Sequence, residues 1–233
     1  VIGKDLLGIA DGNFTIKSGT DGMKSTDDKD TTKGNIIIAG GTFKIEAASD
    51  GIQAENILDI QNGTFDITTG NGSAAVDMKS GDSGAMGGMG TMGVPGENGS
   101  AGTSASSAST SSDTDSVSMK GLKASNAIYI CGGTITLDTE DDSIHSNDSI
   151  TIESGNISIR SGDDGVHADD NLQVDGGTID IKKCCEGLEG VHITLNDGDI
   201  SIVASDDGIN AADGSSSSGM GMGGFGGGQA SSS

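Results

Sequence analysis

The sequence predicts an all-β protein, a parallel β-helix (solenoid) of about seven coils, each of 22 residues with three short strands. Three observations predict this class: a turn ending in glycine recurs along the chain, apolar residues alternate with polar ones beside it, and core-forming residues are scarce. Apolar residues make up 32% of the chain and aromatic residues 2%, so a core forms only if these residues are placed periodically. A unit of this size cannot bury its own apolar face, and it therefore stacks on its neighbours.

The recurring turn sets the register of the repeat. Its members are Asp11-Gly12, Gly40-Gly41, Asn62-Gly63, Gly132-Gly133, Ser154-Gly155, Gly176-Gly177 and Asp197-Gly198. Successive turns are separated by 29, 22, 70, 22, 22 and 21 residues, so the first interval carries a short insertion and the third a long one. We predict one β-helix domain over residues 1–213, with a flexible Gly/Ser/Met-rich insertion at about 70–118 and a low-complexity tail over 214–233.

Three strands are predicted in each repeat, because pairs of inward positions are separated by two residues, which is the strand period. The first strand, before the turn, carries Leu7, Ile36, Leu58, Ile128, Ile150, Leu172 and Ile193. The second strand, after the turn, carries Phe14, Phe43, Phe65, Ile135, Ile157, Ile179 and Ile200. The third strand carries Met23, Ile52, Leu122, Ile144, Val166, Leu188 and Ile209. Equivalent residues stack in such a fold, so we expect the three phenylalanines to form one internal aromatic column.

The charge balance excludes one class of partner. The chain has 35 carboxylates against 12 lysine and arginine residues, a net charge of −23. Binding a polyanion needs a basic surface, so nucleic acid is excluded and a cation is the expected companion. No apolar run reaches the roughly 18 residues that span a bilayer. No secretory leader opens the sequence, although one could have been removed.

Acidic residues recur in the turn before the third strand, and this column is called the acidic edge below. In the last four repeats it contains Asp141, Asp142, Asp163, Asp164, Glu186, Asp206 and Asp207. Like charges about 5 Å apart repel by about 3 kcal/mol at an effective dielectric near 20, so we expect bound calcium, which takes about six to eight oxygen ligands. The alternative is that these residues form turns in solvent. Asp148 and Asp170, after the third strand, could add calcium ligands or close that turn by hydrogen bonds.

Polar residues occupy the outward position of the third strand, and this column is called the polar row. It contains Lys24, Gln53, Lys123, His145, His167, Glu189 and Asn210. An extended ligand could lie along it, which makes Lys123, His145, His167 and Glu189 candidate binding residues. The stacked histidines also suggest a zinc pair, although exposed stacked histidines are the commoner case.

Two further cations follow the second strand. Arg160 and Lys182 are expected to stack with Asp138 in the turn there. They could anchor a ligand carboxylate, or they could pair with neighbouring acidic residues.

Four segments carry a resemblance to a known family. They are Asp163-Asp164-Gly165-Val166-His167-Ala168-Asp169-Asp170, Glu186-Gly187-Leu188-Glu189-Gly190, Asp206-Asp207-Gly208-Ile209-Asn210-Ala211-Ala212 and Met119-Lys120-Gly121-Leu122-Lys123-Ala124. They resemble the recurring motifs of secreted bacterial β-helix proteins that were long catalogued as a domain of unknown function and are now called carbohydrate-binding domain-containing. The resemblance covers about Leu6 to Asp213.

The resemblance implies a right-handed helix of the pectate-lyase kind, several calcium ions, and binding of cellulose-like and acidic plant polysaccharides. The residues that match the family's calcium-associated motif are Asp141, Asp142, Asp163, Asp164, Asp206 and Asp207. Cys185-Glu186 departs from the acidic pair of that motif, which puts a calcium site at that repeat in doubt.

The sequence favours noncatalytic, calcium-dependent binding of a polysaccharide at the bacterial surface or outside the cell. Few aromatic residues are present for stacking on crystalline cellulose, so acidic glycans such as polygalacturonate are preferred over cellulose. One alternative is a calcium-dependent polysaccharide lyase acting on pectate-like uronates, with Arg160, Lys182 or Lys123 as the base. Another is a surface adhesin whose calcium is purely structural. We expect a secreted or surface-attached monomer without catalytic residues.

Overall fold

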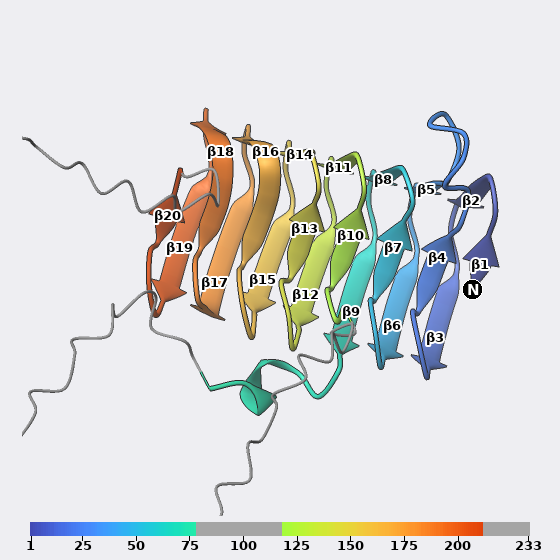
Figure 1. Cartoon of the computed structure of the whole chain (residues 1–233), viewed down its shortest axis with the longest axis horizontal. Helices are drawn as coiled ribbons and strands as arrows, with labels where there is room; N and C mark the ends of the chain where they lie inside the picture. The colour runs from blue at the N-terminus through green and yellow to red at the C-terminus, as the bar shows by residue number, and fades with distance from the viewer. Residues whose placement is uncertain (78–117, 212–233) are drawn as a thin grey trace, which may run out of the picture.

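The computed structural model describes residues 1–77 and 118–211 (Figure 1). The predicted flexible insertion falls largely outside these residues, and the predicted tail over 214–233 falls entirely outside them. Among the described residues, no helix has the length and hydrophobicity needed to cross a bilayer.

The described strands form two sheets in which every pairing is parallel. The larger sheet has 13 strands, and its main path runs through β1 (Ile2–Gly3), β4 (Met23–Ser25), β7 (Ile52–Ala54), β10 (Leu122–Ala124), β13 (Ile144–Ser146), β16 (Val166–Val174), β14 (Ser149–Ile152), β11 (Ala127–Ile130), β8 (Ile57–Ile60), β5 (Asn35–Ile38) and β2 (Leu6–Ile9). Off this path, β18 (Leu188–Leu195) pairs with β16 and with β20 (Ile209–Asn210). The second sheet has seven strands, β3 (Asn13–Ser18), β6 (Thr42–Ala47), β9 (Thr64–Thr69), β12 (Thr134–Asp138), β15 (Asn156–Arg160), β17 (Thr178–Cys184) and β19 (Asp199–Ala204).

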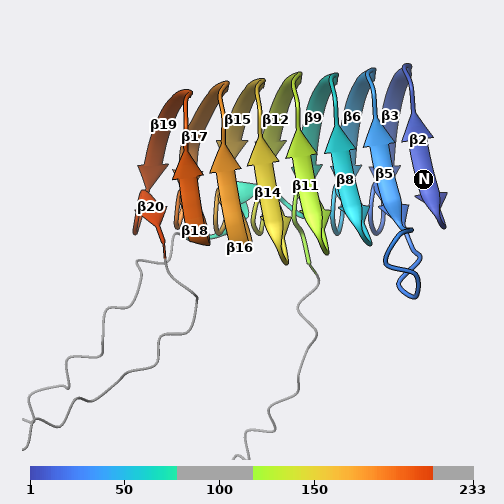
Figure 2. The ribbon, with the colours of Figure 1, turned by 90° about the horizontal axis from the view of Figure 1, so that it is seen from above.

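The larger sheet folds back on itself at β16. One of its arms holds the third strands of the repeats, and the other holds the first strands, which Figure 2 shows as a row from β14 to β2. The ends of the path, β1 and β2, contact each other, so the sheet is nearly closed.

This arrangement corrects the predicted fold class. The protein is all-β with parallel strands, but it is not a clear right-handed β-helix solenoid with three separate strands per coil, because its strands form a nearly closed sheet and a second parallel sheet. The physical reason lies in β16 and β18. The backbone stays extended from Val166 to Val174 and from Leu188 to Leu195, where a turn between third and first strands was expected. These unbroken strands join the two predicted columns into one sheet, although the pairing of β16 with β18 shifts register between Ala168 and Asn171.

The repeat register survives this correction. Ile36 pairs with Leu58, and Ile144 pairs with Val166, each 22 residues further along the chain. Ile52 pairs with Leu122, so the long insertion leaves the register of β7 and β10 intact.

The core is built from the predicted apolar columns. Thirty-one buried residues form one cluster, most of them isoleucine, leucine and valine. Phe14, Phe43 and Phe65 stack with ring centroids 4.9 and 4.7 Å apart and planes within 5° of parallel, which confirms the expected aromatic column.

Two loops are held against the sheets by polar contacts. The short helix η1 (Ser73–Ala75) follows β9, and the backbone N–H of Ser73 donates to Oδ1 of Asp138 at 2.8 Å. Between β4 and β5, Oδ1 of Asp27 accepts the N–H groups of Lys29 at 3.1 Å and Asp30 at 3.2 Å. The seven-residue insertion of the first interval lies in this second loop.

Candidate functional site

The polar row lies on the third-strand arm of the larger sheet. In register, Lys123 of β10 pairs with His145 of β13, His145 with His167 of β16, and His167 with Glu189 of β18. The row follows from the strand period, because in β10, β13 and β16 the flanking residues are buried and the central side chain is partly exposed. Glu189 of β18 continues the row but is itself buried. The four candidate binding residues on these strands therefore lie side by side.

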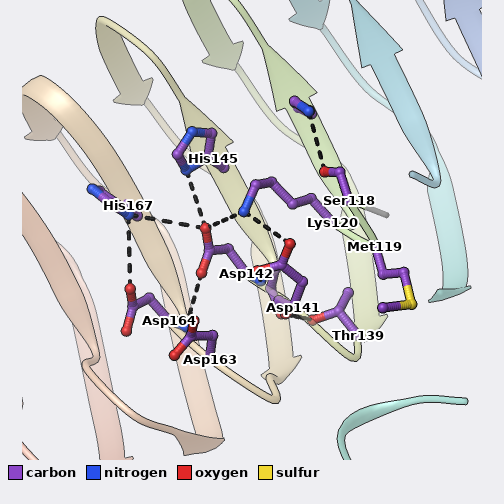
Figure 3. A network of polar contacts seen from close by, with 12 residues as sticks. Ser118, Met119, Lys120, Thr139, Asp141, Asp142, His145, Asp163, Asp164 and His167 are labelled. Carbon is purple, nitrogen blue, oxygen red and sulfur yellow. Dashed lines mark hydrogen bonds and ion pairs between the residues drawn. The ribbon is translucent and has the colours of Figure 1, made fainter. Parts of the chain in front are cut away.

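The acidic edge runs beside this row, in the turns that precede the strands (Figure 3). Oδ1 of Asp142 accepts the backbone N–H of Asp164 at 3.1 Å, and Oδ1 of Asp164 accepts that of Glu186 at 3.0 Å. The same pattern appears earlier, where Oδ1 of Asp50 accepts the N–H of Lys120 at 2.9 Å. One oxygen of each carboxylate thus satisfies a backbone donor of the next repeat.

The turn that carries Asp141 is fixed from inside. The hydroxyl groups of Thr139 and Ser161, both fully buried, donate to the backbone carbonyl of Asp141 at 2.7 and 2.8 Å. Such internal hydrogen bonds hold the acidic side chains at a defined position.

Lys120 is the main cation of the acidic edge. Its Nζ lies 2.6 Å from Oδ2 of Asp142 and 3.1 Å from Oδ2 of Asp141, and its side chain is 14% exposed. Burial disfavours the ionised form of Asp142, but the contact with His145 and the charge of Lys120 outweigh it and hold the pKa of Asp142 well below its ordinary value. Asp142 is therefore ionised.

The two histidines of the polar row face the acidic edge. Nδ1 of His145 lies 3.1 Å from Oδ2 of Asp142, and Nδ1 of His167 lies 3.9 Å from the same oxygen. The rings meet edge to face, with centroids 4.9 Å apart. Burial lowers the pKa of His167 despite the attraction of Asp142, so its imidazole is neutral at neutral pH.

Asp164 and Glu189 are crowded carboxyls. Burial raises the pKa of Asp164 to about 9, and the negative charges of Asp142 and Asp163 add to the rise. Burial and then the charge of Glu186 raise the pKa of Glu189 to about 7. In the metal-free protein at neutral pH, a proton therefore occupies the Asp164 carboxyl.

The side chains offer two kinds of donor set for a cation. Carboxylate oxygens of Asp141, Asp142 and Asp163 lie within 4.8 Å of one another, and an all-oxygen set of this kind suits calcium. Asp142 groups with His145 and His167, and Asp164 groups with His167 and Glu189, within the same distance. Asp163 and Asp164 also group with Cys185, whose sulfur does not suit a hard cation.

The other predicted metal ligands lie elsewhere. The groups found among the described residues include none of Glu186, Asp206, Asp207, Asp148 and Asp170. Oε1 of Glu186 accepts the Asn210 amide at 3.0 Å, and Asp206 and Asp207 are exposed. Asp170 contacts Nδ1 of His192 at 3.0 Å and accepts the Asn171 amide at 2.9 Å. Asp148 accepts a hydrogen bond in a turn through its backbone oxygen, from the N–H of Asp170.

Arg160 and Lys182 lie on the seven-stranded sheet rather than beside the polar row. The expected stack of these two residues is wrong, because the register shifts after Ile159 and Arg160 pairs with Lys183. Lys182 contacts Ser158 at 2.7 Å and Asp180 at 3.5 Å. The structure therefore does not bring these two cations to the candidate site.

Sequence reasoning missed three contributors to the site. Lys120 occupies an acidic column as a counter-ion, and its sign change in an otherwise acidic column was the available signal. Asn147 accepts a hydrogen bond from Nε2 of His145 at 3.0 Å, and Asp169 lies 3.5 Å from Nε2 of His167. Both follow their histidine by two residues, which is the spacing of one strand face.

Comparison with known proteins adds a family. No curated protein and no solved structure matches the chain significantly. A family model described as "Carbohydrate-binding domain-containing protein" matches residues 1–165, which is more than half of the chain. The matched part contains β1 to β15 and the acidic edge as far as Asp164. The chain therefore belongs to the carbohydrate-binding domain-containing family.

Proposed function

We propose that the protein binds a polysaccharide along the polar row, outside the cell and without cleaving it, with calcium at the acidic edge. The observation that carries this proposal is the alignment of Lys123, His145, His167 and Glu189 in register across four neighbouring strands. A linear glycan needs such an extended polar surface, and family membership makes carbohydrate the favoured class of ligand.

An acidic glycan suits this surface better than a neutral crystalline one. Tyr129, the one tyrosine of the chain, lies on β11 in the other arm of the larger sheet and is 38% exposed. The polar row therefore has no tyrosine on which a sugar ring could stack. Calcium bound by Asp141, Asp142 and Asp163 could bridge to a uronate carboxylate, because its coordination sphere accepts oxygen ligands from both molecules.

The surroundings of the lysines argue against a lyase. A base that removes a proton from sugar must have a lone pair available near neutral pH. Lys123 lies 3.5 Å from Asp50, and Lys182 lies 3.5 Å from Asp180. Each of these two lysines is thus engaged by a carboxylate of the protein itself.

Binding to polygalacturonate in calcium and in EDTA tests the proposal. We expect binding in calcium, loss of binding in EDTA, and about tenfold weaker binding for Lys123→Gln. Lys44→Gln is the matched control, because Lys44 is exposed on the outer face of the seven-stranded sheet. We expect no unsaturated uronate product from the wild-type protein.

Each part of the proposal has its own contrary result. Binding that is equal in EDTA and calcium would exclude the calcium bridge. Equal loss of binding in Lys123→Gln and Lys44→Gln would exclude the polar row as the binding surface, and product formation would show a lyase. The double variant Asp141→Asn/Asp163→Asn should lose the calcium response, whereas Asp197→Asn, in an exposed turn, should keep it.

A further inference from the structure

We infer that His145, His167 and Asp142 form a binding site for one divalent transition-metal ion such as Zn²⁺, completed on its far side by Asp164 and Glu189. This inference concerns metal chemistry that the proposed function does not include. It stands whether or not the protein binds a glycan.

The distances around Nδ1 of His167 fit a metal coordination shell. This nitrogen lies 3.5 Å from Oε2 of Glu189, 3.7 Å from Oδ2 of Asp164 and 3.9 Å from Oδ2 of Asp142. Ligands about 2.0–2.2 Å from a tetrahedral zinc ion are separated by roughly 3.3 Å. Small side-chain rotations would therefore bring the donors into a common shell.

His145 provides an independent sign of a missing partner. Its Nδ1 is buried and makes no hydrogen bond, although Oδ2 of Asp142 is 3.1 Å away. Its Nε2 lies 3.0 Å from the amide oxygen of Asn147. Nδ1 of His145 thus faces Oδ2 of Asp142 without a hydrogen bond, and a metal ion between the two atoms would bind both.

In both histidines, the ring nitrogen that faces away from the proposed metal lies near a carboxylate, as is usual for metal-binding imidazoles. Nε2 of His145 and Nε2 of His167 lie 4.0 and 3.5 Å from Oδ1 of Asp169. A carboxylate or amide on the far nitrogen fixes the tautomer and raises the basicity of the coordinating nitrogen. Figure 3 shows both rings, from neighbouring strands, directed toward Asp142.

The donor set selects the class of metal. Two imidazole nitrogens with carboxylate oxygens suit zinc and its first-row neighbours, whereas calcium prefers oxygen alone. Lys120 shares Oδ2 of Asp142, but it also contacts Asp141 at 3.1 Å. Its ammonium group can therefore stay paired with Asp141 when a metal ion takes the Asp142 oxygen.

Zinc titration of the full, chelator-treated chain by calorimetry, in calcium-free buffer and without glycan, tests this site. We expect one zinc ion per chain, with binding weakened by about 100-fold in His145→Gln and in His167→Gln. The chain has three histidines, and the third provides the matched control. His192 is 68% exposed and lies outside the site, so His192→Gln should bind zinc like the wild type.

A second readout covers the case in which a histidine variant fails to fold. In the wild-type protein, zinc should shift the imidazole NMR resonances of His145 and His167 and leave those of His192 unchanged. Equal zinc affinity in His145→Gln, His167→Gln and the wild type would overturn the inference. So would a shift confined to His192. None of these results bears on polygalacturonate binding, so the two proposals fail separately.

Discussion

Both carboxylate oxygens of Asp142 make contacts that connect neighbouring repeats. Its Oδ1 accepts a backbone N–H of the next repeat, while its Oδ2 faces Lys120, His145 and His167. Its side chain is 6% exposed, so the loss of its counter-ion leaves a buried charge. A buried charge without its partner costs far more than an exposed one.

We therefore predict that Lys120→Gln lowers the free energy of unfolding by about 3 kcal/mol in metal-free buffer. Urea denaturation followed by circular dichroism measures the change. The control is Lys17→Gln, because the Lys17–Glu46 pair is also close, at 2.9 Å, but Lys17 is 85% exposed. That variant should unfold at close to the wild-type urea concentration, because an exposed ion pair contributes little to stability. Equal losses in both variants would show that Asp142 does not depend on Lys120.

For the acidic edge, the sequence predicted which residues share a column but not which contacts their side chains make. The repeat placed Asp142 and Asp164 in one column, and the structure confirms that their turns are neighbours. The sequence could not show that one oxygen of each aspartate binds a backbone N–H of the next repeat, because that contact depends on how the turns stack. It also could not show which of the acidic residues cluster, since Asp206 and Asp207 share the motif but remain exposed.

At the scale of elements, strand positions were predictable and strand boundaries were not. The inward apolar columns followed from a period of two residues, and the register of Ile144 with Val166 follows the 22-residue repeat. The extension of β16 through Ala168 to Asn171 was not predictable. Asp169 and Asp170 are typical turn residues, yet the backbone stays extended through them, between the paired residues Ala168 and Asn171.

The phenylalanine column gives a prediction for the second sheet. Phe43 lies in the middle of the column, is 1% exposed and stacks on both neighbours. Phe43→Ala should lower the free energy of unfolding by about 4 kcal/mol, because it leaves a cavity between two rings. Phe14→Ala should cost clearly less, since Phe14 is only partly buried at the end of the column. Equal costs in urea denaturation would contradict this account.

The loop between β4 and β5 gives a prediction for acid stability. The N–H of Lys29 lowers the pKa of Asp27 below its ordinary value, against the opposing effect of burial, and the N–H of Asp30 and Lys4 contribute to the lowering. A carboxyl whose pKa is lowered in the folded state stabilises the protein above its unfolded-state pKa, about 4, and this stability disappears as the pH falls through the folded-state pKa.

The unfolding free energy should therefore fall on acidification below about pH 4, and less steeply in Asp27→Asn than in the wild type. Asp11→Asn serves as the control, because Asp11 is an exposed turn residue on another edge. Parallel pH profiles for Asp27→Asn and the wild type would show that Asp27 is not linked to stability.

At the scale of the whole molecule, the negative charge is distributed along a stack of repeats. Lysines neutralise part of this negative charge in local ion pairs, such as Lys33 with Asp5 at 3.1 Å and Lys120 with Asp142. Among the described residues, no lysine pairs with Asp164 or Glu189, and both carboxyls contact His167. The donor group of Asp164, His167 and Glu189 therefore lies where lysines leave the negative charge uncompensated, whereas Asp141 and Asp142 already pair with Lys120.

The repeat register has a consequence for how the length of such a protein can change. Each strand between β4 and β20 meets a partner one repeat away, and β7 meets β10 across 70 positions without loss of alignment. Removing or duplicating a whole 22-residue unit would leave matching strand edges on both sides of the join. A cut of any other length would place apolar side chains against polar ones. The polar row can thus gain or lose one residue at a time, with one 22-residue repeat, while the other residues of the row keep their register.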